Sequence, residues 1–286
     1  NMNTKVRGRK DLENLSIPFI GEIPQYLSAK KKLGFDKHTQ SVMKAIVVKE
    51  GNRNIINEAF RVLRSNIDFM AGKDSGQNVF MLTSFNPGSG KSFLAMNIAM
   101  SFAIKKKRIL VIDGDLRHGS TSSYVDSPKT GLSDYLGNRV SDWKEIIVKD
   151  EKYDNLHIIP IGTVPPNPTE LLEDGKLATL IEVLRSEYDY IFIDCPPIDI
   201  VADAQIIEKL ADRTVFVVRS GLLDRSMLPE LENIYQEKRF KNLSVILNGT
   251  ESAGGRYGYR YGYRNGYSSY YGNKGKMGGG KWVVIK

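Results

Sequence analysis

The stretch "SFNPGSGKS", from Ser84 to Ser92, decides the fold. It follows a short apolar run, residues 78–84, and precedes a segment with helical spacing, residues 91–105. A glycine-containing loop between a buried strand and a helix is the local context of a phosphate-binding P-loop, because loop amides and the helix N-terminus surround a phosphate. The alternative is a strand–helix turn in which Gly-Lys-Ser occurs by chance.

As a P-loop, this stretch assigns two side chains a task each. Lys91 reaches the outer phosphates of a nucleotide, and the Ser92 hydroxyl ligates Mg²⁺. The candidate phosphate-cradling residues are Pro87, Gly88, Ser89, Gly90, Lys91, Ser92 and Phe93. One position departs from the usual pattern, which has glycine five residues before Gly90, where this chain has Phe85.

Apolar runs and helical stretches alternate along most of the chain. The runs that predict strands are 78–84, 108–113, 156–162, 188–194, 213–220 and 243–249. The expected helices are 54–72, 91–105, 169–187, 203–211 and 224–239. Strands that are apolar throughout are buried on both faces, and intervening helices make them parallel. The prediction is an α/β fold, a doubly wound, mostly parallel sheet with helices on both faces.

Three aspartates follow predicted strands. Asp113 and Asp115 end one strand and Asp194 ends a later one, so all three are expected at the sheet edge where the P-loop opens. Carboxylates are rarely left at such positions without a partner, and Mg²⁺ with its waters is a suitable one. For any single aspartate, helix capping or surface solvation is the alternative.

Together, three motifs resemble those of the deviant P-loop ATPases. "NPGSGKS" resembles the Walker A motif, "ILVIDGDLR" (109–117) the Walker A′ motif and "YIFIDCPP" (190–197) the Walker B motif. Within that group the chain is most similar to the bacterial tyrosine kinases (BY-kinases) of polysaccharide synthesis. The related partitioning and division-site ATPases carry a signature lysine near the start of Walker A, where this chain has Asn86 or Pro87.

The resemblance implies ATP and Mg²⁺ as cofactors and tyrosine as the phosphate acceptor. Ser92, with Asp113 or Asp194 directly or through water, would hold the metal ion. A Walker A′ aspartate is the implied catalytic base, which leaves Asp115 and Asp113 both open. A phenol has a pKa near 10, so only about one in a thousand is ionised at pH 7 without such help.

Two further catalytic assignments remain open at this stage. Arg117 either stabilises the transferred charge or pairs with an aspartate. Asn248, at the end of the last predicted strand, resembles the asparagine that contacts the nucleotide base in the family. The single cysteine, Cys195, beside Asp194, is interpreted as a packing residue.

The stretch "EAFRVLR" resembles the family's E-x-x-R-x-x-R motif. A spacing of three places Glu58, Arg61 and Arg64 along one face of a helix. In the family this motif supports ring-like self-association. A solvated charged stripe is the alternative.

The C-terminal segment, residues 251–286, contains ten glycines and no core pattern, so a flexible tail is expected. The resemblance makes its tyrosines the autophosphorylation cluster, reached in trans by a neighbouring subunit. The candidate acceptors are Tyr257, Tyr259, Tyr261, Tyr263, Tyr267, Tyr270 and Tyr271.

Charge is divided unevenly along the 286 residues, whose net charge is +8. Residues 1–50 carry ten basic and five acidic residues, 51–250 carry 24 and 27, and 251–286 carry seven and one. The mildly acidic centre argues against a nucleic-acid-binding fold, and no nucleic acid partner is expected. Two alternatives stay open: an Arg/Gly/Tyr-rich tail that binds RNA, and a P-loop ATPase switch without kinase activity.

The resemblance therefore implies a juxtamembrane linker at 1–50, a P-loop kinase domain at 51–250 and an autophosphorylation tail at 251–286. No apolar run approaches the ~20 residues of a membrane span. The resemblance implies a membrane region, in the same or a partner protein, that this chain leaves out. We expect a tyrosine kinase at the cytoplasmic face of the bacterial inner membrane that regulates assembly or export of capsular or extracellular polysaccharide.

Overall fold

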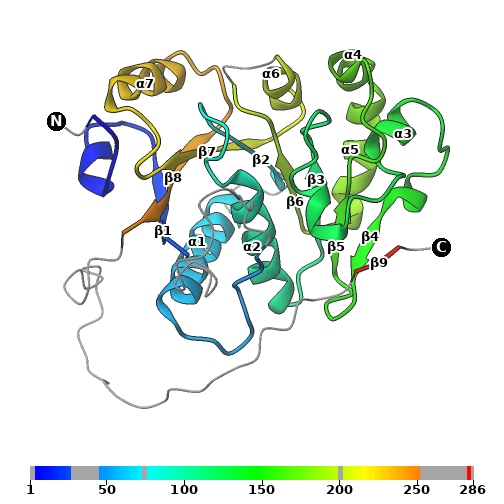
Figure 1. Cartoon of the computed structure of the whole chain (residues 1–286), viewed down its shortest axis with the longest axis horizontal. Coiled ribbons are helices and arrows are strands. Elements are labelled where there is room, and N and C mark those ends of the chain that lie inside the picture. The colour runs from blue at the N-terminus through cyan, green and yellow to red at the C-terminus, as the bar shows by residue number, and fades with distance from the viewer. Residues whose placement is uncertain (1–3, 27–44, 73–75, 199–201, 252–281, 285–286) are drawn as a thin grey trace, which may run out of the picture.

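The computed structural model describes residues 4–26, 45–72, 76–198, 202–251 and 282–284. Their centre is one nine-stranded sheet with the order β1-β8-β7-β2-β6-β3-β5-β4-β9 (Figure 1). Its strands are β1 (Phe19–Pro24), β2 (Val79–Thr83), β3 (Ile109–Asp113), β4 (Val148–Asp150), β5 (Leu156–Ile159), β6 (Tyr190–Asp194), β7 (Arg213–Arg219), β8 (Leu243–Thr250) and β9 (Trp282–Val284). Neighbours from β1 to β5 pair in parallel, whereas β4 pairs antiparallel with both β5 and β9.

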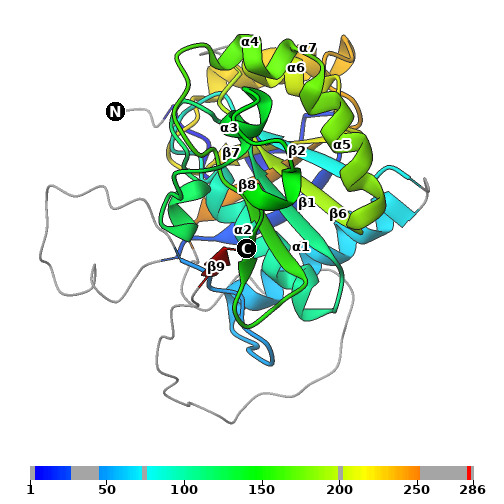
Figure 2. The ribbon, with the colours of Figure 1, turned by 90° about the vertical axis from the view of Figure 1, so that its right-hand side faces the viewer.

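Helices cover both faces of this sheet, as Figure 2 shows from the side. One face carries α1 (Ile55–Gly72) and α2 (Lys91–Ile104). The other carries α3 (Leu132–Leu136), α4 (Pro168–Glu173), α5 (Lys176–Glu187), α6 (Asp203–Glu208) and α7 (Leu228–Gln236). The chain therefore has the doubly wound, mostly parallel P-loop NTPase fold that the alternating pattern predicts.

The burial pattern explains why the apolar runs become central strands. Every residue of β2, β3 and β6 is buried, which requires helices on both sides of these strands. α2 lies over them and has ten buried residues in succession, from Leu94 to Ala103. α1 lies beside α2 on the same face, against β1, and buries one stripe only, which includes Phe60 and Leu63.

Several elements differ from the sequence prediction. The single helix expected at 169–187 is two helices, because Gly175 adopts a left-handed backbone (φ +83°) between α4 and α5. The antiparallel strands β4 and β9 were not predicted. Each has three residues, too few for a periodic pattern.

The linker predicted at 1–50 contributes to the sheet. β1 pairs in parallel with β8, and Gly21 lies against the Leu63 side chain of α1. A Cβ at Gly21 would lie 3.0 Å from that side chain, so the close packing favours glycine. The boundary predicted at residue 50 therefore does not separate β1 from the P-loop domain.

The predicted tail lies mostly outside the described residues. This holds for all seven candidate acceptor tyrosines, Tyr257 to Tyr271. β9 is the exception: Trp282–Val284 pairs with β4, and Trp282 packs against the apolar cluster under α1 and α2. Among the described residues, no helix combines the length and apolar character needed to cross a membrane.

Candidate active site

The carboxyl ends of β2, β3 and β6 form the floor of the site. Asp113 ends β3 directly opposite Asp194, which ends β6, and Asp194 is also in register with Leu82 of β2. The P-loop begins directly after β2, which ends at Thr83, and it ends where α2 begins at Lys91. The sheet thus brings two of the three predicted aspartates side by side beneath the loop.

The loop takes its shape from two left-handed glycines, Gly88 (φ +73°) and Gly90 (φ +92°). Gly90 caps the N-terminus of α2, and a Cβ there would overlap the amide nitrogen of Asn248. The hydroxyls of Ser84 and Ser89 each donate to the Asn86 carbonyl at 2.8 Å, which closes the turn.

Phe85 explains the departure from the usual P-loop pattern. Its ring is buried and meets the Phe216 ring of β7 edge-on, with centroids 4.9 Å apart. The side chain therefore belongs to the core below the loop. Glycine is unnecessary there because Phe85 is not among the positive-φ residues.

Lys91 and Ser92 both face the aspartates. Lys91 Nζ lies 3.2 Å from Ser84 Oγ, and the Ser92 hydroxyl donates to Asp194 at 2.5 Å. Burial lowers the pKa of Lys91, while the charges of Asp194 and Asp115 oppose that shift. An ammonium group held among carboxylates, with one hydroxyl partner, has donors left for an anionic ligand.

The two floor carboxylates are almost without solvent contact. Asp113 accepts hydrogen bonds from the Ser122 amide (2.7 Å) and hydroxyl (2.6 Å), and Asp194 accepts one from Thr121 (2.7 Å). Burial and the neighbouring Asp194 charge raise the pKa of Asp113 to about 8. Burial also raises the pKa of Asp194, against the opposing charge of Lys91.

Paired buried carboxylates of this kind suit a hard cation. The described residues contain no group of three His, Cys, Asp or Glu side chains that could hold a metal by themselves. Mg²⁺ characteristically binds through one or two carboxylates and completes its shell with water and substrate phosphates. The oxygens of Ser92, Asp113 and Asp194 fit that pattern, so the residues present suit Mg²⁺.

Asp115 lies two residues past the end of β3, at the solvent-facing edge of the site. Its side chain retains 12% of its exposure, whereas Asp113 has none. Its backbone amide donates to Asp113 at 3.2 Å, and its carboxylate contacts His118 Nδ1 at 3.1 Å. Asp115 is thus the carboxylate of the three that an incoming side chain reaches most readily.

Arg117 pairs with an aspartate, but with one that the sequence did not single out. Its guanidinium contacts buried Asp203 of α6 at 3.2 Å and donates to Thr169 of α4 at 3.0 Å. Thr169 in turn donates to Asp203 at 2.7 Å. This network joins the Walker A′ segment to two helices of the opposite face.

Asn248 lies against the P-loop from the end of β8. Its amide donates to the Ser89 carbonyl at 2.9 Å. Arg219 of β7 supports the same loop by donating to the Gly88 carbonyl at 2.6 Å. Sequence reasoning missed Arg219, Thr121 and Ser122. In the sequence, Arg219 is marked only by its place at the end of a predicted strand, and Thr121 and Ser122 only by their place after the Walker A′ segment.

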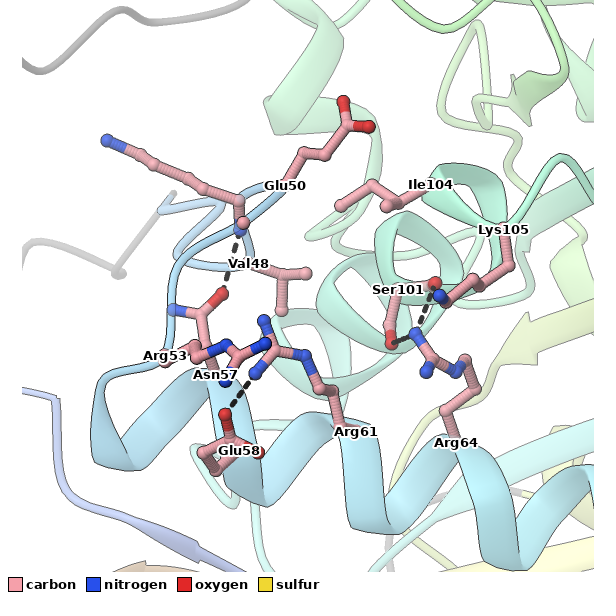
Figure 3. A pocket seen from close by; sticks show the side chains of 12 residues that line it. Val48, Glu50, Arg53, Asn57, Glu58, Arg61, Arg64, Ser101, Ile104 and Lys105 are labelled. Carbon is pink, nitrogen blue, oxygen red and sulfur yellow. Dashed lines mark hydrogen bonds and ion pairs between the residues drawn. The ribbon is translucent and has the colours of Figure 1, made fainter. Parts of the chain in front are cut away.

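The predicted oligomerisation residues lie apart from this site, on α1. Glu58 and Arg61 form an ion pair, and Arg64 donates to the Ser101 carbonyl (3.1 Å) and hydroxyl (3.2 Å) on α2 (Figure 3). All three line a cavity between the two helices. They form neither a simple solvated stripe nor part of the phosphate site.

Comparison with known proteins shows which family has a similar sequence and structure. A family model described as "AAA domain" matches residues 77–239. A putative tyrosine-protein kinase, CapB of Staphylococcus aureus, is 32% identical over 210 residues, which are 73% of this chain and 91% of the relative. A putative tyrosine-protein kinase in the cps region of Klebsiella pneumoniae is 34% identical over 250 residues, 85% of this chain but 33% of the relative.

A solved structure agrees with the sequence relatives. The kinase domain of the Escherichia coli tyrosine kinase ETK superposes with a TM-score of 0.74 and 28% identity, covering 90% of this chain and 100% of that one. The chain therefore spans nearly the whole of the short relative and about a third of the long one.

Proposed function

Because this chain belongs to the bacterial tyrosine-protein kinases of the deviant P-loop ATPase group, we propose that it transfers the γ-phosphate of Mg²⁺–ATP to tyrosine. The acceptors we propose are the clustered tyrosines of its own C-terminal segment, phosphorylated in trans. The product would be a phosphotyrosine-bearing chain and ADP.

One observation carries this proposal. Lys91 and Ser92 begin α2 directly above two adjacent strand-end carboxylates, Asp113 and Asp194. This places cationic and amide donors on one side of a metal-suited oxygen cluster. Phosphoryl transfer depends mainly on positioning and charge neutralisation, which such a cluster supplies. When bound, Mg²⁺ neutralises the charge that develops on the phosphate oxygens.

The chain's own residues take the remaining roles. Lys91 and the amides of Gly88–Ser92 orient the β- and γ-phosphates. Asn248, whose amide already supports Ser89, lies where β8 ends and is our candidate for contact with the nucleotide base. Arg117 keeps the Walker A′ segment in place through Asp203 and Thr169.

Asp115 is our candidate for the base that accepts the phenol proton. The alternative, Asp113, has no exposure, and its two oxygens accept hydrogen bonds from Ser122 and the Asp115 amide. Asp115 lies two residues nearer the opening and retains partial exposure. A base must come within hydrogen-bond reach of the proton it removes, which favours the more accessible carboxylate.

Incubation with Mg²⁺–ATP tests the proposed activity. Phosphotyrosine should accumulate on residues 257–271 and be located there by tandem mass spectrometry, and a chain truncated after Gly249 should gain none in this region. ATP hydrolysis without phosphotyrosine would instead identify an ATPase switch. An RNA-dependent mobility shift without phosphorylation would favour the RNA-binding alternative.

We further propose that the activity serves capsular or extracellular polysaccharide assembly. Support comes from the names of two relatives, the Klebsiella protein, whose name places it in a cps region, and CapB of Staphylococcus aureus. The long relative extends well beyond the matched part. We therefore propose a membrane region, in the same or a partner protein, that holds this domain at the cytoplasmic face.

A ring-like homo-oligomer is the assembly we propose, with the tail of one subunit in the site of its neighbour. Residues 251–286 carry seven basic residues and one acidic residue. Because each phosphate adds about −1.5 to −2 charges, seven would turn the net +6 into about −5 to −8. The phosphorylated chain should then elute as a smaller species in size-exclusion chromatography with light scattering. Identical masses before and after phosphatase treatment would contradict this switch.

A further inference from the structure

A basic cavity of about 440 Å³ lies between α1 and α2 (Figure 3). We call it the α1–α2 cavity. The segment Val48–Arg53, which leads into α1, forms its third wall. Ser101 and Lys105 of its α2 wall follow Lys91 by ten and fourteen residues, so they lie ~15 and ~21 Å along the helix from the P-loop. The cavity is therefore separate from the candidate active site.

Positive charge predominates in this cavity. Its wall residues include two acidic side chains, Glu50 and Glu58, and five basic ones, namely Lys49, Arg53, Arg61, Arg64 and Lys105. Among the described residues, Arg61 is the one of these five cations that forms a salt bridge, with Glu58. Glu50 instead accepts a hydrogen bond from the Tyr153 hydroxyl at 3.4 Å. The α1–α2 cavity thus has more cationic than anionic side chains, and these cations have hydrogen-bond donors left for a ligand.

Arg64 is the anchored member of this set. It is half-buried, and its contacts with the Ser101 carbonyl and hydroxyl hold it against α2. Burial and the nearby charge of Arg61 lower the pKa of Arg64. Two guanidinium groups that repel each other in a recess favour an anion between them, and a phosphate matches their forked donors.

Hydrogen bonds hold the walls of the cavity in place in the ligand-free chain. The side-chain oxygen Oδ1 of buried Asn97 accepts hydrogen bonds from the backbone amides of Val47 (2.8 Å) and Val48 (3.2 Å), and Oδ1 of Asn57 accepts one from the amide of Lys49 at 2.8 Å. Val48 and Ile104 add apolar surface beside the cations. A recess of several hundred cubic ångströms with an apolar wall and converging cations suits a ligand that joins an aromatic ring to a phosphate.

We propose that the α1–α2 cavity binds a phosphotyrosine side chain, and that its ligand is a phosphorylated tyrosine of residues 257–271. The identity of this ligand rests on the kinase activity proposed above. The ring packs on Val48 and Ile104, and the phosphate lies between Arg64 and Arg61. Arg53 and Lys105 add positive charge beside it. The modification creates the ligand, because the unmodified segment is basic and the cavity repels it.

The position of β9 favours this ligand. Trp282 pairs with Asp150 at the end of β4, and Tyr153, three residues further on, contacts Glu50 of the cavity, so the chain following the tyrosines is attached on this side of the molecule. Tyr271 precedes Trp282 by eleven residues, which span up to ~36 Å when extended. The acceptor tyrosines of the same chain are therefore within reach of the cavity.

A peptide titration tests the proposal without kinase activity. The probe is the peptide of residues 257–264 phosphorylated at Tyr261, added to nucleotide-free, phosphatase-treated full chain and followed by fluorescence anisotropy. It should bind at least about tenfold more tightly than the unphosphorylated peptide and than inorganic phosphate. Equal binding of the two peptides, or of phosphopeptide and phosphate, would overturn the proposal.

Paired variants locate the binding. Arg53→Gln/Lys105→Gln removes two exposed cations that carry no ion pair in the described structure, so the fold should persist, and phosphopeptide affinity should fall about tenfold. Lys10→Gln/Lys209→Gln removes the same charge from exposed positions on the opposite face and should leave affinity unchanged. Equal losses in both double variants would reveal non-specific charge attraction and refute the site.

A second measurement identifies the source of the ligand. Wild-type chain that has been phosphorylated with Mg²⁺–ATP should bind the added phosphopeptide more weakly than the phosphatase-treated chain, because its own phosphotyrosines occupy the cavity. Unchanged affinity would exclude residues 257–271 as the ligand. A failure of the proposed kinase activity would show separately, as absent phosphotyrosine before any titration.

Discussion

Replacing Lys91 by methionine should lower tyrosine phosphorylation about 10³-fold or more while the chain stays folded. The ammonium group lies at the start of α2, within 3.2 Å of the Ser84 hydroxyl and near the charges of Asp194 and Asp115. Methionine is unbranched and keeps most of the length of the side chain, but it supplies no charge or hydrogen-bond donor. The variant therefore positions the phosphate less well and no longer neutralises the negative charge that develops during transfer.

Phosphotyrosine on residues 257–271, quantified by mass spectrometry after a timed incubation with Mg²⁺–ATP, measures this effect. Lys10→Met, which changes an exposed lysine on the opposite face, is the matched control and should retain activity. Because burial lowers the pKa of Lys91, removing its charge should not reduce the melting temperature. Undiminished phosphotyrosine in the Lys91→Met protein would mean that another kinase had contaminated the preparation.

The strands that could be predicted from the sequence are the ones that are fully buried. β2, β3 and β6 read as continuous apolar runs because helices cover both of their faces. The strand-end aspartates could be placed at one edge for the same reason, since parallel strands share their carboxyl ends. The direct pairing of Asp113 with Asp194 depends on strand order, which local patterns do not encode.

Features that depend on long-range contacts were not predictable from local sequence. Arg117 pairs with Asp203, which is 86 residues away in the sequence, and no spacing rule connects the two. Thr121 and Ser122 lie in a segment without periodicity, yet their hydroxyls satisfy the two floor carboxylates. Three-residue strands such as β9 are recognised only by the neighbour with which they pair.

Replacing Asp113 by asparagine should separate activity from stability. Phosphorylation should fall about 10²–10³-fold, because one of the two carboxylates proposed to hold Mg²⁺ is lost. The metal-free chain should nevertheless become more stable at pH 8, by about 1–2 kcal/mol or ~3–6 °C in melting temperature. Asparagine keeps an acceptor for Ser122 and removes one of two adjacent buried charges.

The pH dependence of this gain has a defined sign. Burial raises the pKa of Asp113 to about 8, whereas in the unfolded chain it lies near 4. Between those values the unfolded state has already lost the proton that the folded state retains, so this carboxyl weakens folding as the pH rises. The asparagine variant lacks that titration. Its advantage in melting temperature should therefore be small at pH 5 and largest at pH 8, measured by calorimetry in EDTA.

Asp134→Asn provides the opposite case within the same chain. Asp134 is also buried, but hydrogen bonds from Thr163, Gly131 and Arg139 outweigh that burial and lower its pKa. Its charge therefore stabilises the fold above the unfolded pKa, and asparagine there should reduce the melting temperature at pH 8. If both variants lost stability equally, the Asp113–Asp194 pair would not be a strained anionic floor. The electrostatic reason for assigning Mg²⁺ to it would then fail.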